Sequence, residues 1–166
     1  MLVLTLIRHA KSSWDYPELS DFERPLTKRG RRDAPALATR LRKAGIKPDQ
    51  LVSSPATRAI TTARLFAAEL NMAFDDIQLN PHIYEASAWT LMHMVRSFPE
   101  LDDEVMLFGH NPGISQFARE LAQCPFDEMP TCAAVRIGLD VKSWAGVSNG
   151  CGQILRYDIP GRDNRD

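Results

Sequence analysis

Near the N-terminus the chain reads Leu2-Val3-Leu4-Thr5-Leu6-Ile7, and Arg8-His9 follow at once. A short run that is apolar without alternation is typical of a strand buried on both faces of a sheet. We therefore expect residues 2–7 to form a central strand that ends at Arg8 and His9. No basic region precedes the run and charged residues follow it, so the pattern predicts neither a signal peptide nor a membrane span.

Further strands and helices are expected to alternate along the chain. A second buried strand is indicated at Val105–Phe108. Helices are expected at about 27–43, 55–70, 88–98 and 114–121, and weaker strands near 51–52, 77–84, 133–139 and 153–157. This alternation predicts a three-layer α/β/α fold with a mostly parallel central sheet. The last two strands have no helix between them and therefore predict an antiparallel edge.

Polar residues mark the expected helix starts. Thr27 and Ser87 are predicted N-caps. Ser54 followed by Pro55 predicts a third cap with proline at the first helical position. In that helix the spacing of Ile60, Ala63, Ala67 and Leu70 predicts the buried face. Pro35 lies inside the first helical pattern and is expected to delay or kink its start.

The composition is that of an ordinary globular protein. The chain has 166 residues, 44% of them hydrophobic, with 20 Lys+Arg against 21 Asp+Glu and a formal net charge of −1. This length predicts one domain, taken as residues 1–160, with 161–166 as a disordered tail. The near-neutral charge argues against a nucleic-acid binder. Three cysteines are too few for a disulfide framework, so a cytoplasmic location is expected.

Candidate functional residues follow three of the expected strands. Arg8-His9 end the first strand, Arg58 begins the helix after the strand near 51–52, and His110 follows the second buried strand. Ligands of open α/β sheets bind where the strands end. Because arginines and helix N-termini both favour anions, the expected guest is a phosphoryl group. The two histidines lack acidic or cysteine partners at ligand spacing, so no metal site is expected.

Ordered blocks of the sequence resemble the histidine phosphatase superfamily, also called the phosphoglycerate-mutase-like fold. The blocks are Leu6–Trp14, Arg24–Thr27 with Gly30, Val52–Ala63, Tyr84-Glu85 and Gly109–Pro112. They span most of residues 2 to 118. The short chain and the Arg-Pro-Leu-Thr block look most like the SixA-type phosphohistidine phosphatases.

The resemblance implies a role for each matched residue. His9 is the expected nucleophile, Arg8 and Arg58 are expected to clamp the phosphoryl oxygens, and His110 is expected to donate a hydrogen bond to them. Glu85 stands roughly where larger members carry an acidic residue, and it is the candidate proton donor. Further candidate phosphate or substrate contacts are Arg24, Ser12 and Asn111. No cofactor is implied.

Departures from the family pattern bear on the substrate. Ala10 replaces the common glycine, and Asp15 stands where mutases typically have asparagine. A carboxylate there would repel a second phosphate, which argues against a bisphosphoglycerate cofactor. The preferred substrate is phosphohistidine on a partner protein, such as a phosphorelay histidine. Small phosphomonoesters, such as sugar or nucleotide phosphates, remain an alternative, as does a catalytically weak phosphate-binding module. Neither nucleic acid nor membrane is an expected partner.

Overall fold

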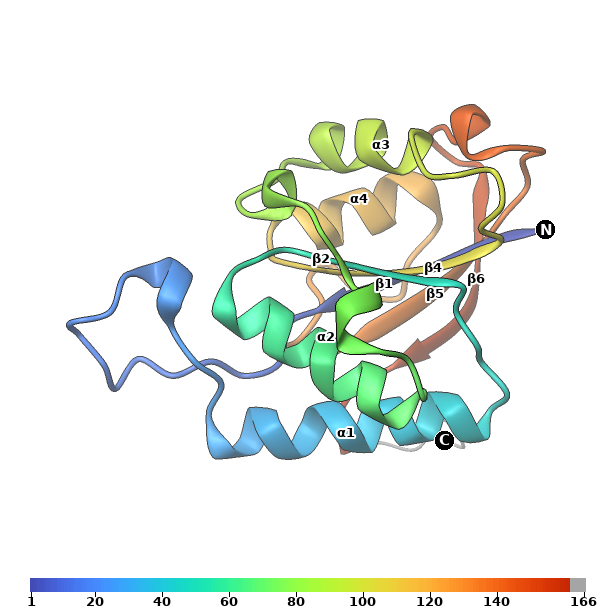
Figure 1. The fold of residues 1–166 in the computed structure, drawn as a ribbon. Coiled ribbons are helices and arrows are strands. Elements are labelled where there is room, and N and C mark those ends of the chain that lie inside the picture. The colour runs from blue at the N-terminus through green and yellow to red at the C-terminus, as the bar shows by residue number, and fades with distance from the viewer. Residues whose placement is uncertain (162–166) are drawn as a thin grey trace.

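The computed structural model describes residues 1–161, which form three layers (Figure 1). Helices α3 (Ala88–Arg96) and α4 (Gly113–Leu121) cover one face of a central sheet, and helices α1 (Lys28–Lys43) and α2 (Thr57–Glu69) cover the other. The expected α/β/α architecture is confirmed. The expectation of a disordered tail falls mainly on residues 162–166, which lie outside the described residues.

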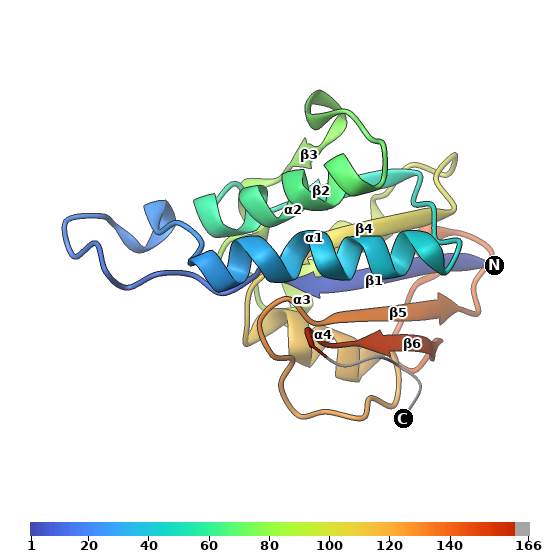
Figure 2. The same ribbon diagram turned by 90° about the horizontal axis from the view of Figure 1, so that it is seen from below.

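The sheet is mostly parallel and has an antiparallel edge, as expected. Its strands are β1 (Leu2–Arg8), β2 (Gln50–Ser53), β3 (Gln78–Leu79), β4 (Glu104–Gly109), β5 (Ala134–Leu139) and β6 (Gly152–Asp158). Their order is β3-β2-β4-β1-β5-β6, which Figure 2 shows from one edge to the other. Strands β1 to β4 pair in parallel. Strand β5 is antiparallel to β1, and β6 is antiparallel to β5.

Strand β1 lies inside the sheet and is buried on both faces. Leu4 and Leu6 pack with Phe117 of α4 in one core cluster, while Ile7 packs with Phe66 of α2 in the other. Each fully buried side chain of this size contributes roughly 1.5–3 kcal/mol to stability. Burial on both faces explains why the run is apolar without alternation.

The helix caps at Thr27 and Ser87 are confirmed. The Thr27 side chain accepts a hydrogen bond from the backbone N–H of Gly30, and the Ser87 side chain accepts one from Thr90. Pro35 neither delays nor interrupts α1, which runs unbroken from Lys28 to Lys43. No helix within residues 1–161 is long and apolar enough to cross a membrane.

Two details of α2 differ from the expectation. The helix begins at Thr57 with Ala56 at the N-cap, so Ser54 is not its cap. The Ser54 hydroxyl is instead engaged with His110 across the site and accepts from the Ala56 N–H. Of the four residues predicted on the buried face, Ala63 and Ala67 are buried, whereas Ile60 and Leu70 are only half-buried. The residues of α2 that are buried are Arg58, Ala59, Thr62, Ala63, Phe66 and Ala67.

The weak strand expected over residues 77–84 is shorter in the structure, where only Gln78–Leu79 forms a strand.

Candidate active site

The candidate residues lie together at the carboxyl ends of three parallel strands, β1, β2 and β4. Arg8 pairs with Gly109 at the ends of β1 and β4, and Ser53 at the end of β2 pairs with Phe108. The next residues along these strands therefore lie together. The ring centroids of His9 and His110 are 5.2 Å apart. The structure thus brings together the two histidines that the sequence singles out.

His9 is buried and its ring orientation is fixed by the neighbouring backbone. Its Nδ1 lies 2.8 Å from the carbonyl oxygen of Ala10. Because a carbonyl only accepts, Nδ1 carries the ring proton and Nε2 keeps a lone pair. Burial lowers the pKa of His9 from 6.5 to about 3, and the nearby charges of Arg58 and Arg8 add to the effect. His9 is therefore neutral at neutral pH, as a nucleophile must be.

His110 is held in the same tautomer as His9, but its other ring nitrogen contacts the protein. Its Nε2 lies 2.8 Å from the hydroxyl of Ser54, which itself accepts from the backbone N–H of Ala56. Among residues 1–161 this hydroxyl has no other acceptor for its proton, so we assign that proton to Nε2, and Nδ1 of His110 then carries the ring proton. Burial, reinforced by the charge of Arg58, lowers the pKa of His110 to about 4. His110 thus presents a neutral N–H donor.

The two arginines are anchored by their terminal nitrogens. Arg8 donates from Nη1 to the carbonyl of Met129 at 2.8 Å. Arg58 donates from Nη1 to the carbonyl of Asp21 at 2.7 Å and from Nη2 to its carboxylate at 3.0 Å. The Nε groups of both arginines are buried.

Three buried nitrogens in this cluster have no hydrogen-bond partner among residues 1–161: Arg8 Nε, Arg58 Nε and His110 Nδ1. A buried donor without an acceptor costs about 1–3 kcal/mol. Three such donors beside the neutral His9 ring have the chemistry to bind an anion that offers several oxygens. A phosphoryl group has this chemistry.

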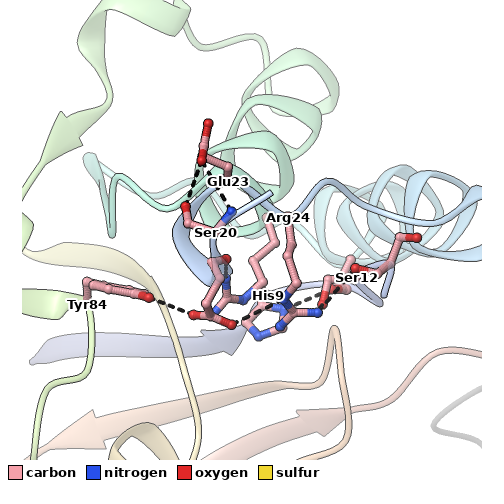
Figure 3. A network of polar contacts seen from close by, with 10 residues as sticks. His9, Ser12, Ser20, Glu23, Arg24 and Tyr84 are labelled. Carbon is pink, nitrogen blue, oxygen red and sulfur yellow. Dashed lines mark hydrogen bonds and ion pairs between the residues drawn. The ribbon is translucent and has the colours of Figure 1, made fainter. Parts of the chain in front are cut away.

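Asp21 lies at the centre of a polar network that Figure 3 shows from Tyr84 across to Arg24 and Ser12. Its carboxylate accepts from the Tyr84 hydroxyl at 2.6 Å and from Arg24 Nε at 3.1 Å, besides Arg58. The Tyr84 bond and the two arginines lower the pKa of Asp21 to about 2. Asp21 is not among the functional residues predicted from the sequence. The acidic residue three places before Arg24 in a long polar loop was the available signal.

Arg24 and Ser12 hold the loop that joins β1 to α1. Arg24 is buried, and its Nη1 donates to the Ser12 hydroxyl at 2.9 Å and to the Ser13 carbonyl at 3.3 Å. The guanidinium also lies over the Trp14 ring at 3.6 Å. Both residues are thus engaged with the loop itself. A direct contact with substrate stays a prediction for each.

Asn111 and Glu85 have different surroundings from the four central residues. The Asn111 amide donates to the Met129 carbonyl at 3.0 Å, and its oxygen accepts from Ser115. It therefore supports the same carbonyl that anchors Arg8. Glu85 is exposed, with a φ of 59°, and forms no hydrogen bond or ion pair within residues 1–161. Their roles toward phosphate and proton transfer stay predictions.

Metal-ligating side chains do not gather anywhere in residues 1–161. No group of three or more His, Cys, Asp or Glu side chains there has the arrangement of a metal site. The remaining histidines, His82 and His93, are exposed, and the His93 ring lies 4.0 Å from that of Trp89.

Comparison with known proteins agrees with this geometry. The model of the histidine phosphatase superfamily (branch 1) matches residues 4–96, which include Arg8, His9 and Arg58. An uncharacterised chloroplastic protein of Arabidopsis thaliana is 31% identical over 149 residues, covering 85% of this chain and 68% of that protein.

Two solved structures share the fold. The protein histidine phosphatase SixA complexed with tungstate matches with a TM-score of 0.80 and 20% identity, over 94% of this chain and 96% of that one. A mycobacterial glucosyl-3-phosphoglycerate phosphatase matches with a TM-score of 0.63 and 17% identity, over 96% of this chain and 98% of that one. By its sequence match and its fold, the chain belongs to the histidine phosphatase superfamily.

Proposed function

We propose that the protein is a phosphatase that acts through a covalent phosphohistidine on His9, and that it dephosphorylates phosphohistidine on a partner protein. Membership of the histidine phosphatase superfamily supports phosphatase activity. The observation that carries the proposal is the set of three unpartnered buried donors, Arg8 Nε, Arg58 Nε and His110 Nδ1, beside the His9 ring.

The reaction has two steps. The Nε2 lone pair of His9 attacks phosphorus, and the bond from phosphorus to the leaving nitrogen breaks as that nitrogen takes the electron pair and a proton. Water then attacks the phosphoryl group on His9, which releases inorganic phosphate and restores the neutral imidazole. The N–H groups of Arg8, Arg58 and His110 bind the phosphoryl oxygens, where charge stabilisation supplies most of the catalysis.

The surroundings of the acidic residues favour an imidazole leaving group over an alkoxide. Asp21 has a pKa of about 2 and is ionised at neutral pH, so it holds no proton to donate. Glu85 is exposed and unanchored. An imidazole leaving group can take its proton from solvent, so it needs no positioned acid. An alkoxide leaving group is a much poorer one unless an acid protonates it. Phosphohistidine therefore fits a site without a buried acid, and SixA, which shares the fold, is a protein histidine phosphatase.

The test compares the wild-type protein with His9→Ala, using a phosphohistidine peptide and a panel of small phosphomonoesters. We expect the peptide to have the highest kcat/KM, and His9→Ala to lose turnover and acid-labile phosphoenzyme with an unchanged circular dichroism spectrum. His93→Ala, which changes an exposed histidine outside the site, is the matched control. Turnover retained by His9→Ala would contradict the covalent mechanism. A preference for one small ester would move the protein to the phosphomonoester class.

A further inference from the structure

The backbone that sets the His9 tautomer is itself held by a buried hydroxyl. The Ala10 carbonyl accepts from His9 Nδ1, and the Ala10 N–H donates to Oγ1 of Thr62 at 3.0 Å. The Thr62 hydroxyl in turn donates to the carbonyl of Arg58 at 2.7 Å. Thr62 is fully buried. One side chain therefore joins the residue after the nucleophile to the backbone of the arginine that faces it.

The direction of these bonds leaves the hydroxyl no alternative arrangement. Thr62 has one hydroxyl proton, and the Arg58 carbonyl can only accept it. The Oγ1 lone pair then accepts from Ala10, whose N–H has no other partner in the structure. The link fixes the end of β1 relative to the first turn of α2.

The same backbone segment is packed against α1 from the other side. A Cβ atom on Gly30 would lie 2.3 Å from the carbonyl oxygen of Lys11, so glycine is required for this approach. The Lys11 carbonyl also accepts from the N–H and the hydroxyl of Thr27, at 2.9 and 3.2 Å. Residues 10 and 11 are therefore clamped between α1 and α2, and Thr62 provides the clamp nearest to His9.

We propose that Thr62 is a positioning residue for phosphoryl transfer. Its hydroxyl holds the Ala10 backbone so that the Ala10 carbonyl keeps the proton on His9 Nδ1 and directs the Nε2 lone pair to phosphorus. The inference rests on the proposed role of His9 as nucleophile. Thr62 would thus keep the His9 ring oriented for attack, and the rate of a displacement at phosphorus depends on that orientation.

The test replaces Thr62 by valine, which has nearly the same shape without the hydroxyl, and by serine, which keeps the hydroxyl. We expect Thr62→Val to lower kcat about ten- to a hundredfold with KM within about twofold, because binding groups remain while the nucleophile is misdirected. Thr62→Ser should recover most of the lost kcat. Nitrogen NMR of the ring should show a protonated Nδ1 in the wild type and a mixture of tautomers in Thr62→Val.

Thr61→Val is the matched control. Thr61 makes a similar bond to the carbonyl one turn earlier, that of Thr57, but it does not contact Ala10. The control should keep both the wild-type kcat and the His9 tautomer. A Thr62→Val protein with wild-type kcat and a single His9 tautomer would overturn the inference, and so would equal losses in Thr61→Val. If Thr62→Val does not fold, Thr62→Ala against Thr62→Ser gives the same comparison. A wild type that forms no phosphoenzyme would instead overturn the proposed function.

Discussion

At the scale of single residues, the two histidines have similar environments and opposite hydrogen bonding. Burial lowers the pKa of both, so both are neutral at neutral pH. A carbonyl faces Nδ1 of His9, whereas a hydroxyl faces Nε2 of His110. The first arrangement leaves a lone pair and the second leaves an N–H. One partner atom for each ring thus determines whether the other nitrogen offers a lone pair, as the proposed nucleophile requires, or an N–H, as the proposed transition-state donor requires.

Ser54→Ala should test the donor half of this arrangement. Without the hydroxyl, the proton of His110 is no longer held on Nδ1, and we expect kcat/KM to fall about five- to tenfold, as for the loss of one hydrogen bond of about 1 kcal/mol. Ser53→Ala is the control, because Ser53 is equally buried and bonds only to the backbone of Ser54. Steady-state kinetics decide the question. Wild-type kcat/KM in Ser54→Ala would contradict the assigned tautomer.

At the scale of elements, the loop between β1 and α1 is part of the site. It projects beyond the layers in both ribbon views (Figures 1 and 2). Asp21 connects it to Arg58 of α2 and to Tyr84 after the 3-10 turn at Pro81–Ile83. This contact engages both terminal nitrogens of Arg58 and leaves Nε as its buried donor without a partner among residues 1–161.

Asp21→Asn should therefore weaken phosphate binding. The amide keeps the size of the side chain but removes the charge that orients Arg58, so we expect KM to rise about tenfold with a smaller change in kcat. Loss of this contact should also loosen the loop, so we expect chymotrypsin to cleave the variant after the exposed residues Trp14 and Tyr16 faster than it cleaves the wild type. Glu23→Gln is the control, since Glu23 contacts only Ser20 in the same turn. Equal KM values for both variants would contradict this role.

The elements also show what the sequence alone could predict. Periodicity and caps gave the sheet class and the starts of α1 and α3, because Thr27 and Ser87 act locally. The start of α2 was wrong because Ser54 is used by His110, a residue 56 positions away, and local pattern does not reveal a tertiary partner. The matched motifs located both histidines and both arginines. Asp21 was missed because two of its partners, Arg58 and Tyr84, are distant in the sequence.

At the scale of the whole molecule, the site lies at the carboxyl ends of the inner parallel strands, where the sheet separates two hydrophobic clusters. One cluster lies under α3 and α4, and the other under α1 and α2. The parallel strands β1 and β4 bring His9 and His110 together at their carboxyl ends, and burial there keeps both rings neutral. The arrangement costs stability, because the unpartnered donors and the two desolvated histidines are each better solvated in the unfolded chain.

The cost of the buried histidines should appear as a pH dependence of the free energy of unfolding. The pKa of His9 is about 3 and that of His110 about 4 in the folded protein, against 6.5 for an unperturbed histidine. Between pH 4 and 6.5 the unfolded chain therefore binds more protons than the folded one. Each histidine lowers stability by up to about 1.4 kcal/mol per pH unit as pH falls through this window, and adds no dependence above it.

Urea denaturation of the wild type and of His9→Gln, at intervals from pH 4.5 to 7.5, measures this contribution. Removing one buried histidine should make the slope shallower below pH 6.5 by up to about 1.4 kcal/mol per pH unit, while the curves run parallel above it. His93→Gln changes an exposed histidine and should follow the wild type throughout. Carboxylates such as Asp21 titrate alike in all three proteins and cancel in the comparison. Parallel curves for wild type and His9→Gln below pH 6.5 would mean that His9 is not buried as a neutral base, and the proposed nucleophile would lose its main electrostatic support.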